Sequence, residues 1–163
     1  AIRGFHGVRA YASASGREAT EPLLEALGMQ VDDTGRWQAA GDERRGQLQW
    51  DDPPEQPGTE GGGTIHHIAW SLADDDELSE FRARVREAGG RPTQIIDRQY
   101  FHSVYFRVPA GVLFELASRD IGFDYDEPLA HLGEELRLPP QYEGLRDELI
   151  ERLTPLQNPR ATA

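Results

Sequence analysis

Residues 64–70, Thr-Ile-His-His-Ile-Ala-Trp, and residues 111–117, Gly-Val-Leu-Phe-Glu-Leu-Ala, are the two segments from which the fold can be predicted. Each is apolar and bounded by glycine, which is typical of a buried strand. The first segment nevertheless carries His66 and His67, and the second carries Glu115, where an ordinary core would place hydrocarbon. Because buried polar groups need partners, we expect a histidine and Glu115 either to satisfy each other or to hold a metal ion together.

The order strand, helix, strand, strand, strand is predicted twice along the chain from its apolar periodicity and its turn residues. In the first copy the elements are expected at 3–12, 17–27, 29–31, 36–40 and 46–50. In the second copy they are expected at 64–72, 74–88, 92–97, 103–108 and 112–118. An offset of about 60 residues relates the copies, indicates an internal duplication and places Gly7 opposite His67.

We therefore predict an α+β fold in which two βαβββ units form a curved, partly closed eight-stranded sheet around a cavity. The domain is expected at 1–119, with repeats at 1–52 and 63–119 joined by a loop at 53–62. A C-terminal extension at 120–163 follows, and it consists of loop with a helix near 142–153.

The first helix has two predicted starts. Ser13 can cap a helix that contains 17–27, but Pro22 is then in the helix interior, where it lacks an N–H donor. Alternatively, Thr20 caps a shorter helix and Pro22 lies in its first turn. The three acidic residues at 74–76 are interpreted as the first turn of the second helix and not as a metal site.

The amino-acid composition limits the kinds of molecule and metal ion that the protein is expected to bind. The net charge of −12 argues against non-specific binding of nucleic acid or anionic membrane. The chain has no cysteine, so any metal would be held by His, Asp, Glu or water, which favours iron(II), manganese or zinc. No apolar run approaches the ~20 residues that span a bilayer and no leader is visible, so a cytoplasmic location is expected.

Of the two histidines, His67 is predicted to face the cavity. Adjacent residues of a strand point to opposite faces, so only one of the two can reach it directly. The small Ala69 shares a face with His67 and leaves room for a ligand, whereas Ile68 and Trp70 share a face with His66. A buried histidine that only hydrogen-bonds to a carboxylate remains the alternative.

Residues 97–106 carry several groups that suit a phenolic substrate. An arginine such as Arg98 can stabilise a phenolate, a tyrosine can donate a hydrogen bond, and a histidine such as His102 can transfer a proton near neutral pH. The alternative interpretation is an aromatic core strand in which Arg98 pairs with Asp97.

Three motifs together, at 63–70, 97–106 and 109–117, resemble the vicinal oxygen chelate superfamily. Within it the chain resembles the C-terminal half of ring-cleaving dioxygenases that open hydroquinones, a group often described as glyoxalase or bleomycin-resistance proteins. Segments 121–127, 132–133 and 138–143 also match that subgroup. The implied activity is oxidative cleavage of a small aromatic substrate by dioxygen.

The resemblance also implies roles for individual residues. It implies an iron(II) site of two histidines and one carboxylate, with manganese or zinc as alternatives. The matching metal ligands are His67 and Glu115, the matching catalytic positions are His66, Arg98 and Tyr105, and the weaker, substrate-binding matches are Tyr100 and His102.

One position departs from the pattern. In the related dioxygenases the third ligand is a histidine of an N-terminal domain, and in this chain Gly7 occupies the related position while His6 is expected to point away. The resemblance therefore implies that the metal site is incomplete in this chain and can be unoccupied. A missing N-terminal domain would supply the third ligand. Two alternatives are a metal-dependent isomerase or lyase whose site is completed across a homodimer by a ligand such as His6, and a metal-free module that binds an aromatic compound.

Overall fold

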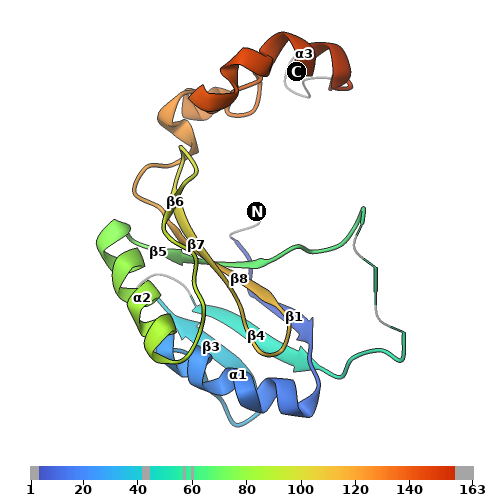
Figure 1. Cartoon of the computed structure of the whole chain (residues 1–163), viewed down its shortest axis with the longest axis vertical. Coiled ribbons are helices and arrows are strands. Elements are labelled where there is room, and N and C mark those ends of the chain that lie inside the picture. Colours follow the sequence, from blue (N-terminus) through green and yellow to red (C-terminus); the bar gives the residue numbers. More distant parts are fainter. Residues whose placement is uncertain (1–3, 42–44, 57, 60, 157–163) are drawn as a thin grey trace.

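The structure, a computed structural model, describes residues 4–41, 45–56, 58–59 and 61–156. Its strands form two four-stranded sheets (Figure 1). The first sheet contains β1 (Gly7–Tyr11), β2 (Gln30–Val31), β3 (Trp37–Ala40) and β4 (Arg45–Asp51), in the order β1-β4-β3-β2. The second sheet contains β5 (Ile68–Leu72), β6 (Ile96–Asp97), β7 (His102–Arg107) and β8 (Leu113–Ser118), in the order β5-β8-β7-β6.

The predicted α+β fold and its duplication are confirmed. In each unit a helix follows the first strand, α1 (Ala14–Ala26) after β1 and α2 (Asp75–Glu87) after β5. In each unit the first strand runs parallel to the last, and the remaining pairs are antiparallel. The strands nevertheless form two separate sheets that are not closed into a barrel, because β1 and β5 each pair on one side only among the described residues.

The start of α1 is fixed by Ser13. Its hydroxyl accepts a hydrogen bond of 3.1 Å from Gly16 N, which satisfies one of the free amides of the first helical turn. The alternative cap at Thr20 is wrong, because Thr20 lies inside the helix and its hydroxyl donates to Gly16 O at 2.7 Å. Pro22 is therefore an interior residue, and α1 forgoes the one hydrogen bond that proline cannot donate.

Three strands are shorter than predicted by several residues. β5 begins at Ile68 and not at Thr64, so both histidines precede the strand. β6 is two residues long and does not extend over 92–97, because Pro92 has no amide N–H and Thr93 N makes an isolated bond to Tyr105 O at 2.9 Å. β1 begins at Gly7, and Arg3, the predicted start of that strand, lies outside the described residues.

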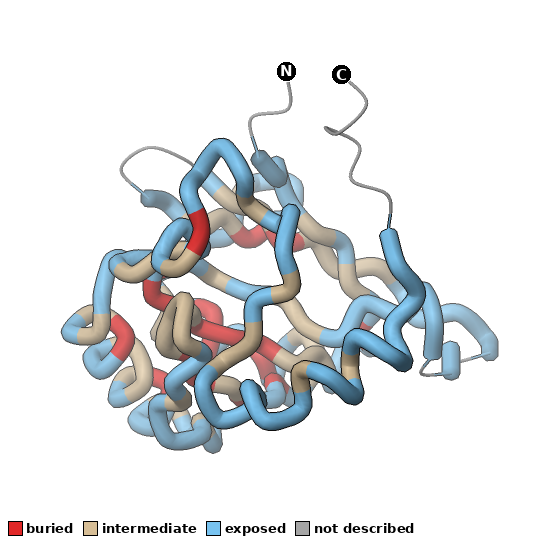
Figure 2. Tube along the Cα trace, turned by 90° about the horizontal axis from the view of Figure 1, so that it is seen from above, coloured by how far each residue is buried: buried red, intermediate tan, exposed pale blue. Residues whose placement is uncertain are grey.

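The core lies between the sheets and their helices (Figure 2). On the second sheet, α2 covers the face that carries Val104, Phe114 and Leu116, all at most 1% exposed. Because side chains alternate along a strand, Tyr105 and Glu115 lie on the opposite face. The candidate site forms on this second face, opposite the face that α2 covers.

The C-terminal extension begins after β8 and leaves the end of the second sheet (Figure 1). It contains short 3-10 helices at η1 (Phe123–Tyr125), η2 (Leu129–His131) and η3 (Pro140–Leu145), then α3 (Arg146–Arg152). The helix expected near 142–153 is thus divided into a 3-10 part and an α part. Within the described residues, no helix is long and apolar enough to cross a bilayer.

Candidate functional site

The site is built around a buried carboxylate, Glu115 of β8, which is 3% exposed. Two groups contact its two oxygens: Tyr105 OH donates to Oε1 at 2.5 Å, and His67 Nε2 lies 2.8 Å from Oε2. Burying a carboxylate is costly unless it is hydrogen-bonded or paired, and here both oxygens have a partner. The contact predicted between a histidine and Glu115 is therefore present, and His67 is the histidine that makes it.

Strand register brings these three residues together. On β7, Tyr105 lies directly opposite Glu115, and on β5 the residue opposite Glu115 is Ala69. Because the side chain of Ala69 ends at Cβ, it leaves space through which the imidazole of His67 reaches the carboxylate. That Ala69 also leaves room for a ligand beside His67 stays a prediction.

His66 contacts His67, and the two rings are not on opposite sides of a strand. Their Nδ1 atoms lie 2.9 Å apart, and the ring planes are nearly perpendicular at 89°. The alternation argument does not apply to this pair, because both residues precede β5. When neutral His67 donates from Nε2 to Glu115, its Nδ1 is an acceptor, so His66 must be the donor.

Arg98 lies over the ring of Tyr105, with its guanidinium carbon 5.4 Å from the ring centroid. The alternative pairing of Arg98 with Asp97 is not present, because Asp97 Oδ1 accepts from Gln99 N at 2.7 Å and lies 3.9 Å from His102 Nε2. In the described part of the chain Arg98 forms no ion pair. Its positive charge thus lies over the ring of Tyr105, the tyrosine that contacts the buried carboxylate.

The structure does not bring His102 to this face. Its Nδ1 lies 2.8 Å from Asp75 Oδ1 in the first turn of α2, on the helix-covered side of the sheet. Two elements therefore hold the imidazole, α2 through Asp75 and the end of β6 through Asp97. The direct substrate contact that the resemblance implies for His102 would need it to turn away from α2.

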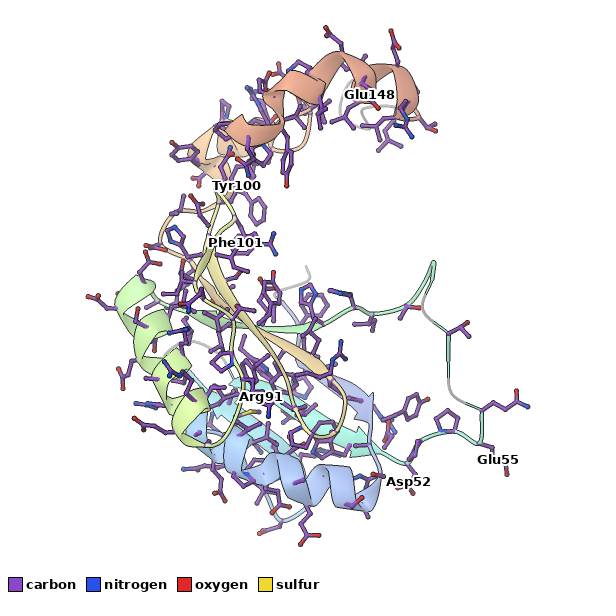
Figure 3. All side chains as sticks on the ribbon, in the orientation of Figure 1. Asp52, Glu55, Arg91, Tyr100, Phe101 and Glu148 are labelled. Atoms are coloured by element: carbon purple, nitrogen blue, oxygen red, sulfur yellow. The ribbon has the colours of Figure 1, made fainter. Side chains whose placement is uncertain are left out.

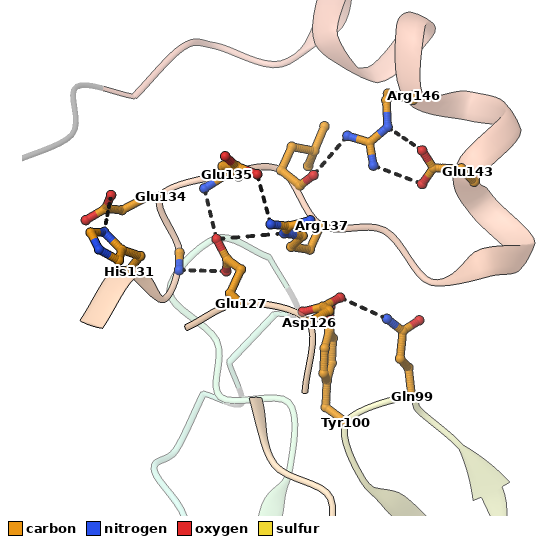
Figure 4. Close-up of polar contacts among 12 residues, drawn as sticks. Gln99, Tyr100, Asp126, Glu127, His131, Glu134, Glu135, Arg137, Glu143 and Arg146 are labelled. Carbon is orange, nitrogen blue, oxygen red and sulfur yellow. Dashed lines mark hydrogen bonds and ion pairs between the residues drawn. The ribbon is translucent and has the colours of Figure 1, made fainter. Parts of the chain in front are cut away.

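Tyr100 contacts the C-terminal extension, toward which its side chain points (Figure 4). Its hydroxyl donates to Asp126 Oδ2 at 2.9 Å, and its ring stacks on Phe123 with 5.2 Å between centroids. Burial, followed by the hydrogen bond to Asp126, raises the pKa of Tyr100. The phenol thus stays a hydrogen-bond donor over a wide pH range.

Sequence reasoning missed the carboxylates that hold this end of the molecule. Besides Asp126, the buried Glu127 accepts backbone hydrogen bonds from Gly133 N at 3.0 Å and Glu135 N at 3.2 Å (Figure 4). A hollow of about 560 Å³ lies beside them and is lined by Tyr100 and by residues of the extension. The segment 121–127 stood out as a motif, but its spacing says nothing of which residues it contacts.

His67 and Glu115 fit as two ligands of a divalent metal ion. Imidazole nitrogen and carboxylate oxygen suit iron(II), manganese or zinc, and two such atoms bound at roughly 2.1 Å and at right angles would be about 3 Å apart. The observed 2.8 Å between His67 Nε2 and Glu115 Oε2 matches this spacing. The other polar atom of each side chain is already hydrogen-bonded, His67 Nδ1 to His66 and Glu115 Oε1 to Tyr105. Within the described residues no three His, Asp or Glu side chains are grouped to hold a metal.

The first unit cannot supply an equivalent histidine without rearrangement. Gly7 corresponds to His67 in the repeat, and a Cβ atom added there would lie 2.9 Å from both Cβ and O of Gln47 on β4. Any side chain at this position would therefore displace the neighbouring strand. The position that repeats His67 thus offers no ligand for a metal.

The chain is similar to one protein family and to ring-cleaving dioxygenases. A family model described as glyoxalase/bleomycin resistance protein/dioxygenase superfamily matches residues 17–116. Chlorohydroquinone/hydroquinone 1,2-dioxygenase of Sphingobium indicum is 42% identical over 107 residues, which is 63% of this chain and 32% of that protein. MhqO of Bacillus subtilis, whose name describes a candidate ring-cleaving dioxygenase, is 39% identical over 100 residues, 61% of this chain and 32% of its own length.

Solved structures agree on the fold. A crystal structure described as a candidate dioxygenase from Bacillus subtilis superposes with a TM-score of 0.81 and 34% identity, over 96% of this chain and 51% of that chain. Lactoylglutathione lyase from Agrobacterium tumefaciens, at 19% identity and a TM-score of 0.50 over 73% of this chain and 96% of that one, shares the fold alone. The chain thus spans about half the length of its solved relative, and its matches cover about a third of each curated one.

Proposed function

The chain belongs to the glyoxalase/bleomycin resistance protein/dioxygenase superfamily, and from that premise we propose that it forms part of an iron(II)-dependent dioxygenase that cleaves the ring of hydroquinone-type diphenols. The observation that carries the proposal is the buried Glu115, contacted by His67 on one oxygen and by Tyr105 on the other. The relatives named as ring-cleaving or hydroquinone dioxygenases support the choice of substrate class.

Each side chain has a task that its position supports. His67 and Glu115 would hold the metal, and a bound iron(II) would supply Lewis acidity and electrons for the activation of dioxygen. Arg98, whose guanidinium lies over the Tyr105 ring, would stabilise the negative charge on a phenolic oxygen. Tyr105 holds the orientation of the Glu115 carboxylate through its hydroxyl.

His66 is suited to move a proton. It is exposed, so it can exchange protons with solvent, and its Nδ1 is hydrogen-bonded to His67. With a metal on His67 Nε2, the proton of His67 would lie on Nδ1, facing His66 Nδ1. In the proposed reaction the substrate hydroxyl would therefore lose its proton to His66 Nδ1 once that nitrogen is released from His67, as the phenolate forms beside Arg98. Both oxygen atoms of dioxygen enter the product, and one ring carbon–carbon bond breaks.

We further propose that the third ligand is a histidine of a second domain outside the described residues. Two protein ligands bind a divalent ion weakly, and the Gly7 position of this chain has no room for a side chain. The solved relative, which is about twice as long as the matched part, is consistent with a partner domain in the same chain.

Oxygen consumption tests the proposal. The full-length gene product that contains this chain would be loaded with iron(II) without air, and oxygen uptake measured with a panel of hydroquinones and catechols. We expect uptake with at least one hydroquinone, and loss of uptake in Glu115→Gln and His67→Ala. No uptake with any member of the panel would refute the proposal.

Metal analysis distinguishes a site completed by a second domain from a site completed across a homodimer. The 163-residue chain alone, incubated with iron(II) and desalted, should retain far less than one ion per protomer. Retention of one ion that is lost in His6→Ala would instead show that a second copy completes the site, and would contradict the second-domain proposal.

A further inference from the structure

The turn at residues 98–101, between β6 and β7, carries Arg98 to the site and is held by the C-terminal extension (Figure 3). The extension contacts it through backbone and side chains. Gly122 N donates to Tyr100 O at 3.0 Å, Phe123 stacks on Tyr100, and Asp126 Oδ2 accepts from Tyr100 OH at 2.9 Å and from Gln99 Nε2 at 3.1 Å.

The backbone of this turn needs such support. Gln99 has a φ of 70°, and it is the only residue other than glycine with positive φ in the described part of the chain. That conformation is unfavourable for a residue with a long side chain, and it persists where the surroundings hold it. Inside the turn it is held by Arg98 N to Phe101 O at 2.9 Å and by Gln99 N to Asp97 Oδ1 at 2.7 Å.

The position of Arg98 follows from the turn. Its side chain is exposed, and among the described residues its one recorded contact is with the Tyr105 ring at 5.4 Å. A change of backbone conformation at the neighbouring Gln99 would redirect the guanidinium, because within the part of the chain that the structure describes no hydrogen bond or ion pair holds it. The distance between Arg98 and the buried Glu115 site therefore depends on the state of the turn.

Asp126 is itself fixed. The next residue, Glu127, is 8% exposed, and its two oxygens accept from Gly133 N and Glu135 N, so the segment that carries Asp126 is tied to the loop that follows (Figure 4). Asp126 Oδ2 takes both of its donors from the turn, and each donor is a neutral group. A carboxylate on a held backbone is suited to keep two donors in one geometry.

We propose that Asp126 is a positioning residue, which holds the 98–101 turn through Gln99 and Tyr100 and thereby keeps Arg98 over Tyr105. The C-terminal extension then acts on the substrate side of the site through the 98–101 turn. The consequence for catalysis rests on the proposed function; the positioning itself does not.

Nuclear magnetic resonance of the full chain tests the positioning without any activity. The Arg98 side-chain protons lie over an aromatic ring, so their resonances should be shifted upfield, and Arg98→Lys identifies them. We expect Asp126→Ala to return them toward solvent-exposed values. The matched control is Asp124→Ala, an exposed carboxylate of η1, which should leave them unchanged. Unchanged Arg98 resonances in folded Asp126→Ala would overturn the proposal.

Tyr100→Phe provides a milder variant that keeps the stack on Phe123 and removes one donor. It should give a smaller displacement of the same resonances, and it keeps the test decisive if Asp126→Ala does not fold. No displacement in folded Tyr100→Phe would then count against the proposal.

Kinetics of the full-length enzyme test the consequence. Asp126→Ala should raise KM for the hydroquinone about tenfold, the order expected for a misplaced charged contact, with a smaller change in kcat. In an Arg98→Ala background the same substitution should have almost no further effect, because the two act through one contact. An equal loss in both backgrounds would show that Asp126 only stabilises the extension. Displaced Arg98 resonances with unchanged KM would instead contradict the substrate role of Arg98 in the proposed function.

Discussion

Replacing Tyr105 with phenylalanine removes one hydroxyl from the site and little else. The ring stays available to Arg98 at 5.4 Å and to His67 at 5.9 Å between centroids, while the 2.5 Å hydrogen bond to Glu115 Oε1 is lost. A hydrogen bond to an ionised group contributes roughly 1.5–3 kcal/mol, and the carboxylate side chain here is 5% exposed, so water replaces the lost donor poorly. We expect Tyr105→Phe to lower the free energy of unfolding by about 2 kcal/mol.

Urea unfolding followed by circular dichroism measures this loss, and thermal unfolding should show a decrease in Tm of about 4–8 °C. The matched control is Tyr125→Phe, because Tyr125 is 68% exposed and its loss of a hydroxyl should change stability by less than about 0.5 kcal/mol. The double variant Tyr105→Phe with Glu115→Gln should be less destabilised than the sum of the single variants. Additive effects, or a Tyr105→Phe protein as stable as the parent, would refute the assignment of this contact.

Three further predictions concern the first unit. The ion pair of Arg9 with Asp51, at 2.7 Å, lowers the pKa of Asp51 chiefly through the side-chain hydrogen bond. Because the folded-state pKa is depressed, the stabilisation is present at neutral pH and is lost as pH falls through that pKa. Arg9→Ala should raise the Asp51 titration midpoint measured by carboxyl carbon resonances, and an unchanged midpoint would contradict the pairing. Ser13→Ala should lower the free energy of unfolding in urea by about 1 kcal/mol, because Gly16 N loses the hydroxyl acceptor that lies 3.1 Å away. An unchanged free energy of unfolding would argue against the cap. Gly7→Ala should cost about 1–3 kcal/mol, because its Cβ would lie 2.9 Å from Gln47; a neutral effect would show that β4 can shift freely.

The sequence was sufficient to predict the repeat and a contact between Glu115 and one of the two histidines. Both follow from local signals: apolar periodicity, glycine at turns, and polar residues inside apolar strands. The choice of His67 rested on side-chain alternation along a strand, which does not apply because both histidines precede β5. The helix start at Ser13 was one of two predicted options, and the presence of Pro22 made the choice ambiguous. The structure resolves it in favour of Ser13, and the burial of Leu23 and Leu24 on the same helix helps to offset the cost of Pro22 inside it.

The surroundings of Tyr100 and His102 could not be predicted in the same way. Their partners, Asp126 and Asp75, come from the extension and from the start of α2, and neither pairing has a periodic signal. The positive φ of Gln99 is equally invisible, because glutamine is not a residue that usually marks such a turn. Polar contacts between residues far apart in the sequence are therefore the part of the site that the sequence could not predict.

The contact of His67 with Glu115 spans almost the entire second unit, and this has a consequence for folding. Between the two residues the chain forms β5, α2, β6 and β7, and β8 must then pair in parallel with β5 before the imidazole meets the carboxylate. Closing so long a loop is entropically unfavourable and is repaid only when the intervening elements pack. The contact should thus be among the last to form during refolding, so a probe on His67 would report completion of the second unit and not its early collapse.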